Sequence, residues 1–520
     1  MARYGYLIFL SFLILASCAQ VGTITGGETD TSAPKPIAEK VNPPNASVNF
    51  TGNTVEIPFD EYFTLSSPTT SIQMVPPHAT VKAVMNKKTL TLSWEEELRP
   101  NTTYAIYLNK TVRDLSERND SIMQYVFSTG STLDSTRFSV SVVDAYTRSP
   151  IAETVVALYD PKSDSLVNFA QTDRSGKANL TYLRPGTYKI IAFQDENKDL
   201  QPQATEEVGF FADSLITIDS TTTLTTPIRQ FKPTPRAELT SAEFVAPATF
   251  LLKTTVDIDD PTVAIDGIAI DSNHYYLEDE TTLHVFVDPT ELSSGKIALT
   301  TSSFSDTSTF RIIDAKRAGT VRIESTQKNK TFAPSQALTF RVNDLIESVD
   351  TSLIRLSNSE DSTHIPYEVS FAKNELTFEV ERGATQEILF EFEKEALSTT
   401  TGTSEAFRGT ITLNSAKKYG IVSLDISSYS SPIILQIVKG SDVVRELSLI
   451  PSSERVLVSE LLPGDYSFNI IHDENQNGRW DTGDFTSRTL PEQIDHYSTT
   501  TKVRANWEVE VELVPTEEEE

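Results

Sequence analysis

The feature that most limits the fold is a recurring alternation of apolar and polar residues in short runs. Val55, Ile57 and Phe59 are apolar, and the acidic Glu56 lies between the first two. The same pattern returns in Leu90, Leu92 and Trp94 and in Tyr104, Ile106 and Leu108. Successive side chains of a strand point to opposite faces of a sheet, so such a run buries one face and exposes the other. The runs are separated by turn-forming residues, and no comparable stretch has a helical period. The sequence therefore predicts an all-β chain of antiparallel sandwiches.

The N-terminal segment has the pattern of a signal for export. Arg3 precedes the apolar run 7–15, which is too short to span a membrane, since spanning takes about 20 apolar residues. The run ends in Leu15-Ala16-Ser17-Cys18, which resembles the lipobox of bacterial lipoproteins, where the cysteine is acylated and the peptide is cut just before it. An ordinary secretory signal with a chance cysteine is the alternative. Cys18 is the only cysteine of 520 residues, so no disulfide explains it, and we favour lipidation.

Lipid on Cys18 implies residence in the cell envelope, with the outer membrane as the expected location. Some lipoproteins of the Bacteroidetes carry an acidic export signal directly after the cysteine, whereas residues 19–22 are neutral here. The resemblance therefore leaves open whether the protein faces the periplasm or the cell surface. The formal net charge of −29 and a pI near 4.6 disfavour nucleic acid as a partner, because the protein and the nucleic acid would both be negatively charged.

Ordered motifs near the N-terminus carry a family resemblance. They are Pro43-Pro44-Asn45, Val55-Glu56-Ile57-Pro58-Phe59-Asp60-Glu61, Leu98-Arg99-Pro100-Asn101-Thr102-Thr103-Tyr104 and Phe127-Ser128-Thr129-Gly130. Together they resemble the bacterial Ig-like domain shared with S-layer proteins. The preceding Gly26-Gly27-Glu28-Thr29-Asp30 and the Pro-rich approach are similar to Bacteroidetes lipoproteins that begin with this domain. The resemblance implies an Ig-like sandwich over residues 33–130.

A second resemblance comes from an internal repeat. A Pro-Gly-x-Tyr turn begins at Pro185 and again at Pro463, and Asp-Glu-Asn begins at Asp195 and again at Asp473, so both features recur after 278 residues. With the turn Thr172-Asp173-Arg174-Ser175-Gly176 ahead of it, the first copy is similar to carboxypeptidase-regulatory-like (prealbumin-like) β-sandwiches. The second copy lacks that Thr-Asp-x-x-Gly turn.

These patterns predict several domains, as the length of the chain allows. Residues 226–330 and 331–415 also show strands and turns, and Leu338–Asp344 followed by Leu353–Leu356 resembles a degenerate Ig-like domain. The predicted order is a signal peptide (1–17), a lipid-anchored tether (18–32), the Ig-like domain (33–130), the first prealbumin-like sandwich (131–225), a sandwich of uncertain type (226–330), a degenerate Ig-like sandwich (331–415), the second prealbumin-like sandwich (416–514) and an acidic tail (515–520).

One loop has the spacing of a metal site. Counting Asp473 as position 1, side-chain oxygens stand at positions 1, 3, 5, 9 and 12, and Gly478 stands at position 6; these donors are Asp473, Asn475, Asn477, Asp481 and Asp484, with the backbone carbonyl of Arg479 at position 7. This is the ligand spacing of an EF-hand calcium loop, although position 12 is Asp instead of Glu and the flanks are strands. We expect either a structural Ca²⁺ site or a plain polar turn. The earlier counterpart, Asp195, Asn197 and Asp199, is predicted to be a plain loop.

Motifs of catalysis are not found. The six histidines are scattered and show no metal spacing; they are His78, His274, His284, His364, His472 and His496. The sequence has no Gly-x-Ser-x-Gly elbow, no phosphate-binding Gly loop, and no cysteine besides Cys18. We therefore predict a protein that is not an enzyme and has no catalytic residues.

Two hypotheses about function follow. The first is a lipid-anchored scaffold of β-sandwiches that holds, spaces or recognises other envelope proteins or glycans. The second is a carbohydrate- or protein-binding accessory lipoprotein that serves a transporter or an enzyme. Exposed tryptophans would favour the second hypothesis, and the candidates are Trp94, Trp480 and Trp507. Of these, Trp94 is predicted to lie in a core because it stands at an alternating position.

Overall fold

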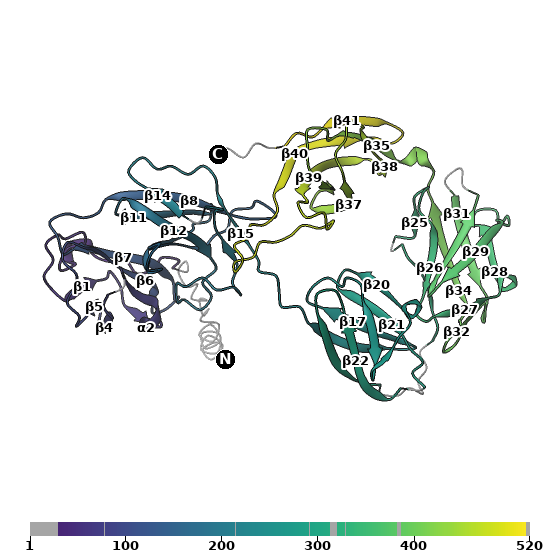
Figure 1. The fold of residues 1–520 in the computed structure, drawn as a ribbon, viewed down its shortest axis with the longest axis horizontal. Helices are drawn as coiled ribbons and strands as arrows, with labels where there is room; N and C mark the ends of the chain where they lie inside the picture. The colour runs from purple at the N-terminus through teal and green to yellow at the C-terminus, as the bar shows by residue number, and fades with distance from the viewer. Residues whose placement is uncertain are drawn as a thin grey trace, which may run out of the picture.

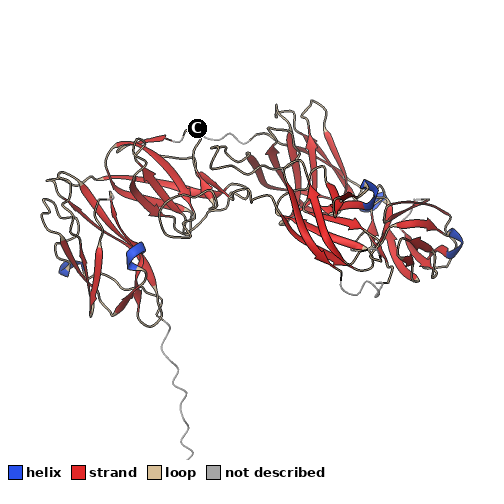
Figure 2. Cartoon of the chain, turned by 60° about the horizontal axis from the view of Figure 1, so that its bottom comes forward, coloured by secondary structure: helices blue, strands red, loops and turns tan. Residues whose placement is uncertain are grey.

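The computed structural model describes residues 30–515, apart from 77, 214, 291, 313–319, 328 and 382–385. The predicted signal peptide and Cys18 lie outside the described residues. Within them, no helix is long and apolar enough to cross a membrane. Strands dominate, as Figures 1 and 2 show, and this confirms the predicted all-β class. We call the five successive groups of strands the first to fifth sandwich.

The first sandwich packs two small sheets, with strand orders β1-β5-β4 and β2-β6-β3, and β7 pairs with β6. The alternating residues predicted to be apolar strand faces are buried, and Trp94 is 2 % exposed in the same core, as predicted. Its elements are η1 (Ala38–Lys40), β1 (Thr54–Pro58), β2 (Phe63–Leu65), α2 (Pro68–Ser71), β3 (Ile72–Val75), β4 (Lys82–Asn86), β5 (Thr89–Ser93), β6 (Thr103–Asp114) and β7 (Asp120–Ser128).

The second sandwich is one folded sheet of order β10-β9-β12-β13-β15-β8-β11, and β14 pairs with β12. The pair β15–β8 is parallel, and the other pairs are antiparallel. The strands are β8 (Thr136–Asp144), β9 (Val155–Tyr159), β10 (Leu166–Gln171), β11 (Lys177–Leu183), β12 (Gly186–Phe193), β13 (Val208–Gly209), β14 (Leu215–Ile218) and β15 (Ile228–Phe231).

The third and fourth sandwiches form from the middle of the chain. In the third, sheets β16-β17-β21-β20 and β19-β18-β22-β23 enclose one core. Its elements are β16 (Leu239–Val245), β17 (Thr249–Thr254), β18 (Thr262–Ile265), β19 (Ile268–Ala269), η2 (Ser272–His274), β20 (Tyr275–Asp279), β21 (Thr282–Phe286), β22 (Ser294–Thr300) and β23 (Ser305–Arg311).

In the fourth, sheets β24-β26-β30-β29, β25-β34-β31-β28 and β27-β32-β33 enclose another core. Its elements are β24 (Ile323–Ser325), β25 (Thr331–Phe332), β26 (Leu338–Val342), β27 (Ile346–Val349), η3 (Thr351–Leu353), β28 (Ile354–Asn358), β29 (Tyr367–Ala372), β30 (Glu375–Val380), β31 (Gln386–Phe392), β32 (Leu397–Thr399), β33 (Gly402–Thr403) and β34 (Phe407–Leu413).

The fifth sandwich repeats the plan of the second. Its sheets are β38-β35-β41 and β37-β36-β39-β40, and β35–β41 is parallel, as β8–β15 is in the second sandwich. Its elements are η4 (Ala416–Lys418), β35 (Gly420–Asp425), β36 (Ile433–Lys439), β37 (Asp442–Leu449), β38 (Val456–Leu461), β39 (Gly464–His472), β40 (Ile494–Val503) and β41 (Glu508–Glu512).

The offset of 278 residues found in the sequence relates corresponding strands of these two sandwiches. It carries Val155, which begins β9, onto Ile433, which begins β36, and Gly186, which begins β12, onto Gly464, which begins β39. The tyrosines of the two turns also match: Tyr188 Oη donates to the Arg184 carbonyl at 2.5 Å and Tyr466 Oη to the Leu462 carbonyl at 2.6 Å. The repeat is therefore structural as well as sequential.

The chain closes on itself, because the fifth sandwich returns to the second (Figure 1). The third and fourth are joined by Lys373 Nζ, which donates to the Tyr275 carbonyl at 2.7 Å. The fourth and fifth are joined by Ser335, whose backbone N–H donates to the Glu460 carboxylate at 2.7 Å. The second to fifth sandwiches thus form a ring.

Candidate functional site

The long loop between β39 and β40, residues 473–493, contains the predicted calcium donors, and we call it the β39–β40 loop. Asp473 follows β39 directly and is 3 % exposed. Its carboxylate accepts hydrogen bonds from the backbone N–H groups of Asn477 and Gly478, both at 3.0 Å. This buried acid therefore holds the first turn of the loop in place.

Asn475, Asn477 and Asp481 lie in the same turn as Asp473. The amide oxygens of Asn475 and Asn477 accept backbone hydrogen bonds from Asn477 and Arg479, both at 3.0 Å. Their amide nitrogens donate to the Asp481 carboxylate, from Asn477 at 2.8 Å. The structure thus brings together four of the predicted donors and the backbone of a fifth, Arg479.

Asp484 does not join them. Its carboxylate accepts hydrogen bonds from the backbone N–H of Ser487 at 2.6 Å and from the Ser487 hydroxyl at 2.8 Å. Its backbone pairs with Thr489 in both directions. Asp484 therefore closes a separate turn further along the loop.

Glu492 lies beside the first turn of the loop, and sequence reasoning missed this contact. Its carboxylate is 9 % exposed and accepts hydrogen bonds from the backbone N–H groups of Glu474 and Asp481, both at 3.0 Å. Burial raises the pKa of Glu492, and the nearby charges of Asp481 and Asp473 add to the shift. No local pattern marks this residue, because the chain runs through a second turn before it returns to the loop.

The second sandwich contains the same loop after β12. Asp195 accepts hydrogen bonds from the backbone N–H groups of Asp199 at 3.1 Å and Leu200 at 3.3 Å, as Asp473 does at the equivalent positions. Glu206 is buried like Glu492 and accepts a hydrogen bond from the Gln203 backbone at 3.1 Å. The two loops are therefore related elements, and that the first is a plain loop stays a prediction.

These loops differ in what they pack against. Leu200 of the first loop is 2 % exposed in its own sandwich, and its carbonyl accepts the hydroxyl of Tyr159 at 2.8 Å. Gly478 occupies the equivalent position in the β39–β40 loop and contributes no side chain. The β39–β40 loop instead places its apolar side chains on the second sandwich.

Trp480, Phe485 and Leu490 make this apolar contact. All three pack against an apolar cluster that the second sandwich shares with the first. The Trp480 ring meets Tyr146 edge to face, with 5.0 Å between ring centroids, and its indole N–H donates to the Glu492 carbonyl at 3.1 Å. Trp480 is therefore a half-buried contact between sandwiches.

Polar groups extend the contact to the third sandwich and the linker before it. The Arg479 guanidinium pairs with Asp257 at 2.6 Å and Asp259 at 3.1 Å. The Thr482 hydroxyl donates to the Lys232 carbonyl at 2.7 Å. Beneath them lies a cleft of about 790 Å³, lined by residues of the second, third and fifth sandwiches. The β39–β40 loop thus joins three parts of the chain.

Continuous apolar runs could have signalled packing between sandwiches. Every residue of β9 is buried, as are the first residues of β36. Each strand buries one face in its own sandwich and the other against a neighbour. A run that is apolar at every position predicts burial on both faces, whereas alternation predicts burial on only one.

Metal-binding groups are sparse among the described residues. No three His, Cys, Asp or Glu side chains are grouped closely enough to hold a metal ion by themselves. At the β39–β40 loop a cation would also need amide and carbonyl oxygens. Those oxygens are hard donors of the kind that Ca²⁺ takes, although the amide oxygens now accept backbone hydrogen bonds.

The histidine beside the loop belongs to a buried polar cluster. His472 Nε2 lies 2.9 Å from the Asp495 carboxylate, which also accepts the Tyr429 hydroxyl at 2.8 Å. Asp495 is fully buried. His496 instead faces the second sandwich, since its Nε2 lies 2.7 Å from the Tyr146 carbonyl. These two histidines therefore support packing within the fifth sandwich and between it and the second.

Comparison with known proteins gives one family match. A family model described as the bacterial Ig-like domain matches residues 30–129, the first sandwich. This confirms the resemblance to that domain. No curated protein matches the sequence.

Several solved structures are similar at low identity. They include SGBP-B from the mixed-linkage glucan utilization locus of Bacteroides ovatus, in complex with a mixed-linkage heptasaccharide (12 % identity, 71 % of this chain and 91 % of that chain, TM-score 0.20). They also include domains 1–6 of the surface layer protein SbsC (10 %, 85 % and 66 %, 0.15) and the Bacillus anthracis TIE protein (8 %, 98 % and 78 %, 0.15).

Proposed function

We propose that the protein is a non-catalytic scaffold of the cell envelope, held to a membrane by lipid on Cys18. The observation that carries the scaffold role is the contact of the β39–β40 loop with the second sandwich. A chain of sandwiches joined only by linkers would bend at each linker. Closure of the second to fifth sandwiches into a ring restrains those motions. A scaffold needs this restraint, because it must present its surfaces at fixed distances from one another.

The lipid anchor is supported by sequence alone. Cys18→Ser removes the acceptor thiol, so we expect the variant protein to leave the membrane fraction and appear in the soluble fraction. Ser17→Ala is the matched control, because it keeps the small residue before the cysteine. Retention of the Cys18→Ser protein in the membrane after a salt wash would refute lipid anchoring.

Crosslinking in the native envelope tests the scaffold proposal. Photo-crosslinkers placed at exposed positions of each sandwich should capture a small, reproducible set of envelope proteins. Capture from two or more sandwiches of the same molecule would support a role in holding partners at fixed positions. Release of a modified glycan or peptide by the purified protein, abolished by a point mutation, would overturn the non-catalytic role.

The second candidate is a glycan-binding accessory lipoprotein, and the exposure of Trp507 favours it. Its side chain is 67 % exposed, whereas Trp94 is buried and Trp480 lies between sandwiches. An exposed tryptophan can stack on a sugar ring. Glycan-array binding that is lost in Trp507→Ala would support this candidate, and an array without signal would count against it.

We further propose that the β39–β40 loop holds a structural Ca²⁺. Asp473, Asn475, Asn477, Asp481 and the Arg479 carbonyl would supply oxygens, as the spacing predicts, and Glu492 supports the proposal as an additional carboxylate. The ion would offset the repulsion that the charges of Asp481 and Asp473 exert on the Glu492 carboxylate. A rise in the melting temperature on addition of millimolar calcium would support this proposal, and no rise would refute it.

A further inference from the structure

The first sandwich is open on one side, between two strands that lie at the edges of their sheets. β4 is the last strand of the sheet β1-β5-β4, and β3 is the last strand of β2-β6-β3. A groove of about 760 Å³ lies between them, and its apolar lining includes Ile72, Met74, Val81 and Ala83. Figure 1 shows β4 at the border of the first sandwich, with no other described part of the chain beyond it. This side of the molecule is therefore accessible to a partner.

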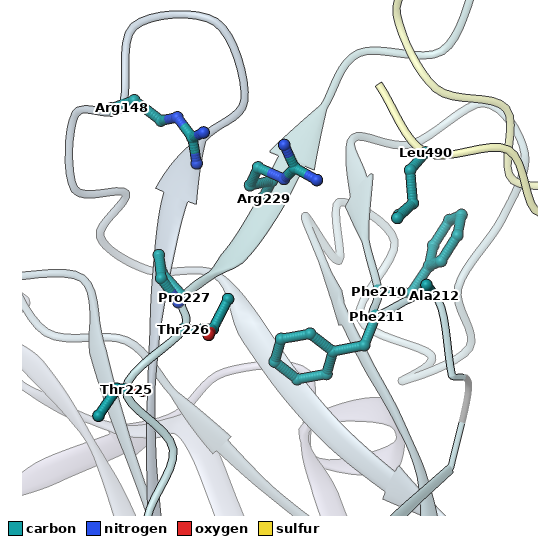
Figure 3. A pocket seen from close by; sticks show the side chains of 9 residues that line it. All are labelled: Arg148, Phe210, Phe211, Ala212, Thr225, Thr226, Pro227, Arg229 and Leu490. Carbon is teal, nitrogen blue, oxygen red and sulfur yellow. The ribbon is translucent and has the colours of Figure 1, made fainter. Parts of the chain in front are cut away.

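The groove differs from a cavity of about 410 Å³ where the β39–β40 loop meets the second sandwich (Figure 3). Arg148, Arg229 and Leu490 line that cavity. Both arginines already have interaction partners in the chain, so the cavity is part of the contact between sandwiches. Beside the groove, in contrast, β4 exposes apolar side chains: 61 % of Val84 and 43 % of Met85 are exposed.

The backbone of β4 can form hydrogen bonds on its outer edge. At the start of β5, on the side of β1, the Phe59 N–H donates to the Lys88 carbonyl at 2.7 Å. Because hydrogen bonds alternate between the two sides of an antiparallel strand, even-numbered residues of β5 bond toward β1 and odd-numbered residues bond toward β4. Val84 faces an odd-numbered residue of β5, so its backbone groups bond inward. The N–H and C=O groups of Ala83 and Met85 therefore point outward.

The side chains of this edge are suited to pairing with another strand. Met85 and Ala83 face two fully buried leucines of β5, so both lie on the inner face of the sheet, and Val84 lies on the outer face. A lysine on an edge strand usually keeps other strands away. Here the Lys82 ammonium pairs with the Glu95 carboxylate at 2.5 Å, so that charge is already balanced.

We propose that β4 pairs with β4 of a second copy of this chain, antiparallel about a two-fold axis at Val84. In this register Ala83 of each copy faces Met85 of the other, and each such pair exchanges two backbone hydrogen bonds. Val84 packs against Val84 of the second copy. The Met85 side chain enters the groove of the other copy, beside Ala83, and two three-stranded sheets join into one.

Charge complementarity favours a second copy as the partner. The turn after β4 contains Lys87 and Lys88, whereas residues 95–97, at the opposite end of the hairpin, are all Glu. The Glu96 carboxylate accepts a hydrogen bond at 3.3 Å from the backbone N–H of Thr80, which lies just before β4. The two-fold register places this acidic end beside the basic turn of the other copy, and the symmetry repeats the contact.

Sedimentation equilibrium of the full chain in density-matched detergent tests the inference. The interface is small and its affinity low, so the concentration should span about 5–500 µM, and we expect a monomer that becomes a dimer. Val84→Lys sets like charges opposite each other and should raise the dissociation constant about tenfold or more. Val443→Lys, at an exposed valine of the edge strand β37, is the matched control.

Ala83→Pro removes an N–H that points away from β5, so it should weaken dimerisation without lowering the melting temperature of the monomer. This variant keeps the test decisive even if Val84→Lys does not fold. A monomer at every concentration would overturn the inference. Dimerisation that is unchanged in folded Val84→Lys and Ala83→Pro would also overturn it.

Disulfide formation tests the register. The Cα atoms of two residues at a non-hydrogen-bonded position on the axis lie about 4.5 Å apart, which a disulfide can span. In the Cys18→Ser chain, which has no other thiol, mild oxidation should crosslink Val84→Cys about tenfold faster than Val443→Cys. Equal rates would overturn the pairing.

The same variant tests the choice of partner in the native envelope. Adducts of Val84→Cys with a different protein, and none with a second copy, would show that another strand occupies this edge and would overturn the inference. The inference goes beyond the scaffold proposal, because neither lipid on Cys18 nor closure of the ring depends on β4.

Discussion

At Gly483 the β39–β40 loop approaches the second sandwich so closely that no side chain could fit. A Cβ atom built there would lie 2.6 Å from Phe231 Cζ and 2.8 Å from the Thr489 carbonyl oxygen. Phe231 is buried in the second sandwich, and Thr489 belongs to the turn that Asp484 closes. A single residue thus determines how closely two sandwiches can meet.

Gly483→Ala should therefore destabilise the closed chain. Steric overlap with a packed core costs about 1–3 kcal/mol, so we expect the midpoint of urea unfolding to fall. Gly402→Ala is the matched control, because no atom lies within 4 Å of its added Cβ. Equal midpoints for the two variants would contradict the close approach described here.

Individual residues also show what local patterns predict. The Thr-Asp-x-x-Gly turn is stabilised by Asp173, whose carboxylate accepts hydrogen bonds from the Ser175 hydroxyl at 2.6 Å and backbone at 2.8 Å. These hydrogen bonds hold the pKa of Asp173 below its usual value, with the Ser175 hydroxyl as the largest cause. Its partners are two to four residues away, so sequence alone predicts the turn. Glu492 has partners 11 and 18 residues away and could not be found in this way.

At the scale of the element, the β39–β40 loop joins buried acids to the contact between sandwiches. Asp473 and Glu492 organise its first turn, and Trp480, between them in sequence, packs outward on Tyr146. A change in the charge of the loop should therefore alter the stability of the contact.

The raised pKa of Glu492 makes this dependence on pH testable. A carboxyl whose pKa is higher in the folded state contributes stability that is fully present below about pH 4.5, its unfolded pKa, and is lost as pH rises through the folded pKa. Glu492→Gln removes this contribution. With EDTA present, the melting temperature of the variant relative to wild type should rise as pH increases from 4 to 7. A difference that is constant across this range would contradict the assignment.

Bound Ca²⁺ should offset the destabilisation that the ionised Glu492 carboxylate causes. If the loop binds Ca²⁺, millimolar calcium at pH 7 should raise the melting temperature, since the ion binds the folded state preferentially. The rise should be smaller at pH 4, because protonated carboxyls are poor ligands. Asp473→Asn should reduce the rise, and Asp199→Asn in the related loop is the control. No rise in the melting temperature at pH 7 would show that the loop is an ordinary polar turn.

At the scale of the whole molecule, the ring depends on a few side chains of one loop. Partly exposed ion pairs such as Arg479 with Asp257 contribute only about 0–1 kcal/mol each, so burial of apolar side chains must contribute more. Trp480 has the largest of the apolar side chains that the β39–β40 loop packs against the second sandwich.

The double variant Arg479→Ala/Trp480→Ala should open the ring. Loss of both contacts frees the fifth sandwich from the second and third, so the radius of gyration from small-angle X-ray scattering should increase. Trp507→Ala is the matched control for loss of an indole, because Trp507 is exposed. An unchanged radius in the double variant, with its secondary structure intact, would show that other contacts close the ring.

Strands, turns and the repeat of 278 residues were determined by the sequence itself, because alternation and turn residues act between neighbours in the chain. The bacterial Ig-like domain was recognisable for the same reason, through ordered local motifs. Only the tertiary structure decided that Trp480 packs on Tyr146, that Glu492 contacts the first turn of the loop while Asp484 closes a separate turn, and that Arg148 and Arg229 line one cavity. These residues meet across long separations in sequence, and such contacts depend on how whole sandwiches pack. Local periodicity contains no information about that packing beyond the unbroken apolar run of β9 and the three apolar residues that begin β36.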